Sequence, residues 1–264
     1  MIEIDLIRHV KVSGKSALYG CTDVAPIATE NSRLLKRLIA QQKTSNAYQM
    51  VVSSPLIRCQ KIAKDFSKES QLPLTISPTL QEMNFGIFDG VPFDDLCFDD
   101  LCFGDLAFDS ELVDEGLINK NPELLWSELE SFFNAPAEIM LPEAELLTEF
   151  HKRVILAWSN LVEKQINVVI KQNESQIPKR ILLIAHGGVI RMILAHILQL
   201  DWQQASWHQK LQIGHGSLSR ISINIPYQNI KLSQKHPNQQ QPNQQYEQLH
   251  QQVTSIAIPF LEGF

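Results

Sequence analysis

Short apolar runs alternate with longer amphipathic segments over most of the chain. Runs of strand length lie at 50–53, 72–76 and 180–185, and two further segments of strand length, 2–8 and 218–225, alternate apolar and polar residues. Between them, apolar residues recur at helical spacing over 29–42, from Pro55 onward, near 122–134 and 143–165, and over 189–200. Strands that alternate with helices predict a mostly parallel central sheet covered on both faces, which is a three-layer α/β/α architecture.

Residues 93–112 break this pattern. They read FDDLC FDDLC FGDLA FDSEL, a five-residue unit repeated four times with decay. The spacing of Phe and Leu fits neither the helix period nor the strand period. We interpret the repeat as an acidic insertion in a surface loop, although its phenylalanines could cap a pocket or support a homodimer.

The pattern also changes near the C-terminus. We predict one domain over residues 1–230, which carries the insertion, and a Gln-rich tail over 231–264. The stretch from Gln234 to Gln252 is rich in Gln, Asn and Pro and has few apolar residues to bury. Such a composition is typical of disorder, although the final IAIPFLEGF could dock on the domain.

Charge and cysteine usage exclude several classes of function. The formal net charge is −6, which disfavours nucleic acid as a partner. The four cysteines form no CxxC pair and have no histidine at zinc-finger spacing. The first ten residues lack the basic segment of a signal peptide, and no apolar run is long enough to span a bilayer. We therefore expect a cytoplasmic protein that does not bind membranes.

Polar residues follow three of the predicted strands where each strand ends. Arg8-His9 closes the first strand, Ser53-Ser54 the second, and His186-Gly187 follows the run at 180–185. Because ligands of parallel α/β sheets bind beyond the carboxyl ends of the strands, these residues should converge on one pocket. The helix after His186 adds N-terminal N–H groups that favour an anion.

Four modest motifs follow one another along the chain. They are Arg8-His9, Arg58 in SSPLIRCQKIA, Glu82 in LQEMNFGIFDG and His186 in IAHGGVIR. In this order and on these elements, they resemble the histidine phosphatase superfamily, also called the phosphoglycerate mutase-like family, over roughly residues 2–225. The early stretch HVKVSGKSALYGCTDV looks most similar to the α-ribazole phosphatase branch, which acts late in cobalamin assembly.

The resemblance implies a role for each residue. His9 would attack phosphorus, and Glu82 would protonate the leaving oxygen and later activate water. The residues implied to hold phosphate or substrate are Arg8, Arg58, His186, Gly187 and Lys15. The resemblance implies neither a metal nor a cofactor.

Elementary chemistry agrees with these roles. Arginines present charged, planar forks to phosphate oxygens. The ordinary pKa of an imidazole is about 6.5, and neighbouring arginines depress it further, so His9 is available as a neutral nucleophile.

The sequence departs from the family pattern near the predicted site. Val10 and Val12 stand where the family usually has Gly and Thr, and Lys15 stands where Asn often occurs. Near 142–146, Pro-Glu-Ala-Glu-Leu replaces the usual Pro-x-Gly-Glu-Ser, which retains Glu145. These changes leave the catalytic set intact and bear on substrate binding.

Three functions remain open. The first is a phosphomonoester hydrolase that acts on a small phosphorylated metabolite such as α-ribazole 5′-phosphate. The second is a phosphoglycerate mutase-like phosphotransferase, for which the acidic repeat is a poor cover against water. The third is a non-catalytic phosphate-binding protein, which the valine at position 10 would explain.

Three further expectations concern single residues. His215 fits a solvated turn better than the edge of the site. Ser54 is explained as the cap of the helix that follows it. Replacement of Arg58 should cost catalytic rate more than stability.

Overall fold

One sheet forms the centre of the molecule. The computed structural model describes residues 1–96, 122–172, 179–225 and 250–261. The strands of this part of the chain are β1 (Ile2–Arg8), β2 (Met50–Ser53), β3 (Leu74–Ile76), β4 (Lys179–Ala185), β5 (Ser217–Asn224) and β6 (His250–Pro259). They lie in the order β3-β2-β4-β1-β5-β6. The first four strands of that order run parallel, whereas β5 pairs antiparallel with β1 and β6.

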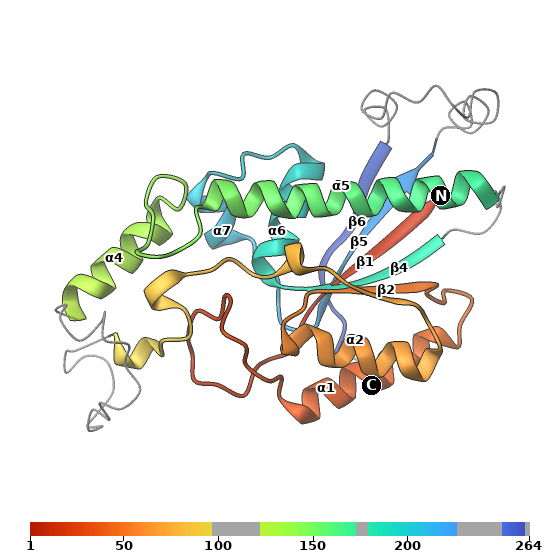
Figure 1. Cartoon of the computed structure of the whole chain (residues 1–264), viewed down its shortest axis with the longest axis horizontal. Coiled ribbons are helices and arrows are strands. Elements are labelled where there is room, and N and C mark those ends of the chain that lie inside the picture. Colours follow the sequence, from red (N-terminus) through yellow and green to blue (C-terminus); the bar gives the residue numbers. More distant parts are fainter. Residues whose placement is uncertain (97–121, 173–178, 226–249, 262–264) are drawn as a thin grey trace.

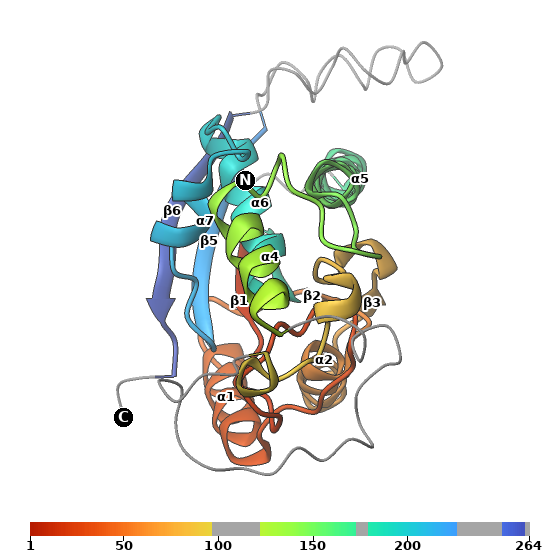
Figure 2. The same cartoon turned by 90° about the vertical axis from the view of Figure 1, so that its left-hand side faces the viewer.

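Helices cover both faces of this sheet (Figure 1). On one face lie α1 (Ala28–Gln42) and α2 (Ile57–Ser70), and on the other lie α5 (Leu147–Gln172) and α6 (Gly187–Leu198). The helices α4 (Pro122–Asn134) and α7 (Ala205–Lys210) contact each other on the side of the carboxyl ends of β1 and β4 (Figures 1 and 2). Short 3-10 turns occupy Pro78–Leu80, Gly86–Phe88 and Phe93–Asp95.

Alternate residues of the central strands enter two separate cores. On β1, Ile2, Ile4 and Leu6 pack in the core with α5 and α6, whereas Ile7 packs in the core with α1 and α2. Successive side chains of a strand point to opposite faces, so a strand covered on both sides buries side chains on both. The predicted three-layer α/β/α fold with a mostly parallel sheet is confirmed.

The chain's last strand lies within the predicted Gln-rich tail. β6 pairs with β5 from Ser217↔Pro259 to Asn224↔His250 and adds an edge to the sheet. Exposed and half-buried positions alternate along this strand, but the glutamines of HQQVTSIAIP make this alternation hard to recognise in the sequence. Residues 231–249 of the predicted tail and 97–112 of the predicted insertion lie outside the described residues. The domain boundary at residue 230 stays a prediction.

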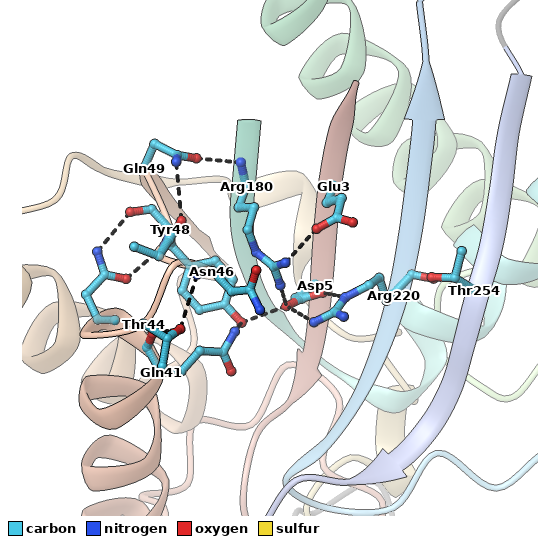
Figure 3. Close-up of polar contacts among 12 residues, drawn as sticks. Glu3, Asp5, Gln41, Thr44, Asn46, Tyr48, Gln49, Arg180, Arg220 and Thr254 are labelled. Carbon is cyan, nitrogen blue, oxygen red and sulfur yellow. Dashed lines mark hydrogen bonds and ion pairs between the residues drawn. The ribbon is translucent and has the colours of Figure 1, made fainter. Parts of the chain in front are cut away.

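A cluster of buried charges holds β1, β4 and β5 to the α1 layer (Figure 3). Asp5 is 1% exposed and accepts hydrogen bonds from Tyr48 at 2.7 Å, from Arg180 at 3.0 Å and from Arg220 at 2.7 Å. Arg180 also donates to Glu3 at 2.6 Å. Burial and the neighbouring Asp5 raise the pKa of the Tyr48 hydroxyl well above its usual value, so it remains a donor. The cluster therefore satisfies the buried Asp5 carboxylate, whereas Nε of Arg180 is buried without a hydrogen-bond partner among the described residues.

Removal of Asp5 should strongly destabilise the fold. Asp5→Ala leaves two guanidiniums and a phenol without their shared acceptor, and breaking a buried pair in this way costs about 3–5 kcal/mol of unfolding free energy. Urea denaturation measures the change. Asp65→Ala, which breaks the exposed pair with Lys61, is the control and should cost under about 1 kcal/mol. Equal losses in the two variants would contradict this account.

Candidate active site

The carboxyl ends of β1 and β4 bring two histidines together. The parallel register pairs Arg8 with Ala185, so His9 and His186 follow side by side. The N–H of His9 donates to the carbonyl of Ala185 at 3.0 Å. The ring centroids lie 5.2 Å apart, and the two residues are 5% and 0% exposed. The expected convergence of strand ends is present at these positions.

The hydrogen bonds of His9 define its tautomer. Its Nδ1 lies 2.7 Å from the carbonyl oxygen of Val10. A carbonyl only accepts, so we assign the ring proton to Nδ1 and a free lone pair to Nε2. Burial, and after it the charges of Arg58 and Arg8, lower the pKa of His9 well below its usual value. The ring is therefore neutral near pH 7 and can act as a nucleophile.

His186 is held between a guanidinium and a hydroxyl. Its Nδ1 accepts from Nε of Arg58 at 3.2 Å, so its Nε2 carries the proton and donates to Oγ of Ser54 at 2.7 Å. Burial, and after it His9, lower the pKa of His186 well below the usual value. The expected role of Ser54 as a helix cap is wrong, because the N-cap of α2 is Leu56 and Ser54 orients His186.

Arg58 is fully buried and binds a loop as well as His186. Its Nη2 donates to the carbonyls of Tyr19 and Gly20 at 2.8 and 2.7 Å, and its Nη1 donates to that of Thr22 at 2.8 Å. One N–H on Nη1 then remains for a phosphate oxygen. These contacts favour a combined loss of rate and stability on replacement, rather than the loss mainly of rate expected from the sequence.

Asp89 shapes the loop that Arg58 binds. Its carboxylate accepts the N–H groups of Gly20, Cys21 and Thr22 at 3.2, 2.8 and 2.9 Å. With its N–H groups held on one side, the loop turns its carbonyl groups toward Arg58. Sequence reasoning missed Asp89, although Asp-Gly at 89–90 is a turn signal and Gly90 has a φ of +82°.

Arg8 presents donors that have no protein partner among the described residues. Its Nη1 donates to the carbonyl of Ile213, whereas its Nε is buried and makes no hydrogen bond in this part of the chain. The guanidinium lies against Gly187, whose hypothetical Cβ would be 3.4 Å from Cζ of Arg8. An unpartnered donor beside the N-terminus of α6 is suited to bind an anion.

Glu82 reaches the same helix terminus. Its Oε2 accepts the N–H of Gly188 at 2.9 Å, and its Oε1 accepts the N–H of Met83 at 3.1 Å. A Cβ on Gly188 would lie 2.3 Å from Oε1, so only glycine permits this approach. Arg153 donates to the carbonyl of Glu82 at 2.9 Å and forms an ion pair with Glu145. Glu145, which is retained from the family motif at 142–146, therefore supports Glu82 through Arg153.

The remaining predicted positions lie at the edge of this cluster or away from it. Lys15 is exposed, and its Nζ is 3.9 Å from the carboxylate of Asp95. Val10 is buried in the core on the α1 side. His215 is exposed in its turn, yet its ring centroid is 5.2 Å from that of His9 and its Nδ1 donates to the carbonyl of His9 at 3.2 Å. The expected exposed turn at His215 is present, and the same turn also brings His215 to the edge of the site, because the N–H of Gly216 donates to the carbonyls of Arg8 and His9.

Partial burial and the charge of Arg8 lower the pKa of His215 to about 4.

Among the described residues, no group of three acidic, histidine or cysteine side chains could hold a metal ion. No helix within the described ranges has the length and apolar character needed to cross a membrane.

A match to a protein-family model identifies the family of this chain. The model of the histidine phosphatase superfamily (branch 1) matches residues 4–98 and 113–234. The chain belongs to this superfamily. It is therefore an enzyme of a metal-independent family whose members act as phosphatases or mutases and typically take phosphorylated small molecules. The unmatched stretch, 99–112, coincides with most of the repeat, and that the repeat is an insertion stays a prediction.

Relatives of the superfamily differ in their reported activities. The chain is 24% identical over 223 residues to a probable phosphoglycerate mutase of Yersinia pestis, across 84% of this chain and 85% of the relative. The α-ribazole phosphatase of Shigella flexneri matches with a TM-score of 0.59 and 21% identity, over 84% of this chain and 91% of that one. A mycobacterial glucosyl-3-phosphoglycerate phosphatase with inorganic phosphate matches with a TM-score of 0.66 and 14% identity over all of both chains. These structures confirm the expected phosphoglycerate mutase-like fold.

The neutral histidines should make stability depend on pH. The pKa of His9 is lower in the folded state than its unfolded value of about 6.5, so the unfolded chain binds more protons as pH falls below that value. The stability present above pH 6.5 is therefore lost on acidification, by up to about 1.4 kcal/mol per pH unit for this one group. Urea denaturation at pH 7.5 and 5.5 measures the loss.

His9→Gln should show a smaller loss than the wild type, since it removes one of the contributing groups. His250→Gln, on the exposed edge strand, serves as the control and should follow the wild type. An unchanged pH dependence in His9→Gln would show that His9 does not stay neutral in the fold.

Proposed function

We propose that this enzyme hydrolyses phosphomonoesters of small metabolites through a covalent phosphohistidine on His9. The observation that carries the proposal is the state of His9, which is buried and neutral and has its Nδ1 proton committed to Val10. Its Nε2 carries the free lone pair, and its ring lies 5.2 Å from that of His186 and close to the charges of Arg58 and Arg8, which would hold a phosphate. The proposed order of events follows from these positions.

In the first step, Nε2 of His9 attacks phosphorus and the bond from phosphorus to the leaving oxygen breaks. Glu82 gives its proton to that oxygen, so the alcohol leaves as a neutral product. Arg8 offers its unpartnered Nε, and Arg58 offers its remaining N–H, to the equatorial oxygens. Phosphoryl transfer depends chiefly on such positioning and charge neutralisation, and a preorganised donor contributes about 3 kcal/mol.

In the second step, water attacks the phosphohistidine. Glu82 accepts a proton from this water, the bond between phosphorus and Nε2 breaks, and inorganic phosphate leaves. His9 regains its lone pair, and Glu82 regains the proton that it gave to the alcohol. The N–H groups of Gly188 and Met83 hold the Glu82 carboxyl group in the same place in both steps.

A mutase is the second candidate function. The similarity to a probable phosphoglycerate mutase over most of both chains favours it. In a mutase the phosphohistidine would return its phosphoryl group to a second oxygen of the substrate instead of to water. Isomerisation of phosphoglycerate, without release of phosphate, would distinguish this outcome from hydrolysis.

The α-ribazole phosphatase reaction, and with it a part in cobalamin biosynthesis, is one specific form of the hydrolase proposal. Its support is the sequence HVKVSGKSALYGCTDV near the N-terminus and the shared fold with the Shigella flexneri enzyme. A panel of phosphomonoesters that includes α-ribazole 5′-phosphate tests it. Turnover of other esters but not of this one would reject the specific form and keep the general one.

Replacement of His9 should abolish turnover. His9→Ala removes the attacking nitrogen, and loss of a catalytic nucleophile lowers kcat by at least about 10³-fold. Release of phosphate from the panel measures this change, and rapid quenching into alkali tests for a labelled, acid-labile phosphoenzyme in the wild type only. His196→Ala, at an exposed position on α6, is the control and should retain activity. A His9→Ala variant that keeps its rate would refute the covalent route.

Gly188→Ala should impair proton donation selectively. The added Cβ would meet Oε1 of Glu82 at 2.3 Å and displace the carboxyl group from α6. General acid catalysis contributes about 10²–10⁴-fold for a poor leaving group. We expect a loss of at least about tenfold in kcat with an alkyl phosphate and little loss with p-nitrophenyl phosphate, whose leaving group needs no proton.

Gly214→Ala is the matched control for Gly188→Ala, because a Cβ at position 214 meets nothing closer than 3.9 Å. It should behave as wild type on both esters. Equal losses on the alkyl and nitrophenyl esters in Gly188→Ala would mean that Glu82 is not the proton donor.

A further inference from the structure

A cavity of about 330 Å³ opens beside Glu82. Glu82 and Gly188 form the end of the cavity nearest to the two histidines. The loop after Glu82 and the helices α4, α5, α6 and the end of α7 supply its other walls. Figure 2 shows α4, α6 and α7 gathered on this side of the sheet.

The position of Glu82 identifies which part of a substrate would enter this cavity. This step depends on the proposed function, in which Glu82 protonates the leaving oxygen. A proton donor must lie within hydrogen-bond reach of that oxygen, about 2.6–3.2 Å away. The remainder of the leaving group is bonded to the same oxygen, so it must extend from Glu82 into the adjoining space.

The walls of the cavity are mainly aromatic and aliphatic. Phe85 and Phe132 meet edge to face with ring centroids 6.4 Å apart, and Phe132 and Phe133 lie 5.7 Å apart. Phe150 and Met192 complete this apolar surface. Such walls bind a flat apolar group through burial and ring contacts, and they disfavour a small charged group that would lose its hydration.

One cationic side chain breaks the apolar lining. Arg191 lines the cavity, and its Nη1 donates to the carbonyl of His208 at 2.8 Å. Its Nε is buried and has no hydrogen-bond partner among the described residues. Because this guanidinium lines the cavity, a ligand carboxylate in the cavity would pair with its charge and gain affinity and specificity there.

We propose that this cavity binds the leaving group of the substrate, that the leaving group is a fused or substituted aromatic ring system carrying a carboxylate, and that Arg191 selects for this carboxylate. The volume lies within the range of small-molecule sites, about 300–1,000 Å³. It exceeds what a three-carbon leaving group such as glycerate fills. The cavity therefore favours a hydrolase of bulky esters over a phosphoglycerate mutase.

Binding and turnover of three alkyl phosphates test the proposal. The probes are ethyl phosphate, 2-(naphthyl)ethyl phosphate and the same naphthyl ester with a ring carboxylate, which share a primary alkyl leaving oxygen. Calorimetry with the inactive His9→Ala variant measures affinity, and phosphate release by the wild type measures kcat/KM. The naphthyl ester should bind about tenfold more tightly than the ethyl ester, and the carboxylate should add about another tenfold.

Two variants assign these gains to the walls. Arg191→Met should bring the ratio between the carboxylated and plain naphthyl esters close to one, and Phe133→Ala should reduce the ratio between the naphthyl and ethyl esters. Arg33→Met on α1 and Trp126→Ala on α4 are the matched controls, since neither residue lines the cavity, and both should retain the wild-type ratios.

The outcomes separate the two proposals. Discrimination in binding without turnover of any ester would overturn the proposed hydrolysis and keep the cavity as a ligand site. Turnover with equal affinity for all three esters would overturn the cavity proposal and keep the hydrolase. An Arg191→Met variant that weakens all three esters equally would place Arg191 at the phosphate and also overturn the assignment.

Discussion

The parallel pairing of β1 with β4 is the constraint on which the site depends. This ladder aligns Arg8 with Ala185, and the hydrogen bond from the N–H of His9 to Ala185 continues it by one residue. The imidazoles of His9 and His186 are adjacent because their strands end at the same level. A shift of one residue in this register would turn one imidazole toward the opposite face of the sheet. The hydrogen bond from the N–H of Ser54 to Ile184 sets the level of β2 in the same way.

The charges of the site do two things at once. Arg8 and Arg58 bind backbone carbonyls rather than carboxylates, so these contacts hold the guanidiniums in place without cancelling their charge. The uncancelled charge attracts a phosphate, and it also helps to keep His9 neutral. The same two arginine charges therefore bind the anion and keep the nucleophile His9 neutral. Burial strengthens both effects, because screening by water is weak where His9 lies.

Sequence patterns predicted the elements better than the contacts between them. Apolar runs located β2 and β4, and alternation of apolar and polar residues located β1 and β5. The rule about strand ends brought His9 and His186 together. The contacts of Ser54 with His186 and of His215 with His9 were not predicted, because local explanations, a helix cap and a solvated turn, were available for both residues. Their contacts join segments more than 130 residues apart, and no periodicity encodes such a meeting.

The strand β6 was not predicted, because the composition of this segment indicated a disordered tail. The glutamines before Val253 resemble a disordered tail, but an edge strand needs apolar residues on one face only, and β5 provides the partner. The loop partners of Arg58 could not be predicted either, because they are the carbonyl groups of Tyr19, Gly20 and Thr22 and carry no side-chain signature.

The two halves of the candidate site come from different parts of the fold. The half that would hold phosphate consists of strand ends and the first turn of α6, and the ladder of the sheet fixes its geometry. The cavity beside Glu82 takes its distinctive walls from α4 and the end of α7, outside the sheet. Changes in these helices can alter the shape of the cavity without moving His9 or Arg8, since no strand pairing connects the two halves. The repeat at 93–112, most of which the family model leaves unmatched, precedes α4 in the sequence, and α4 lines the cavity.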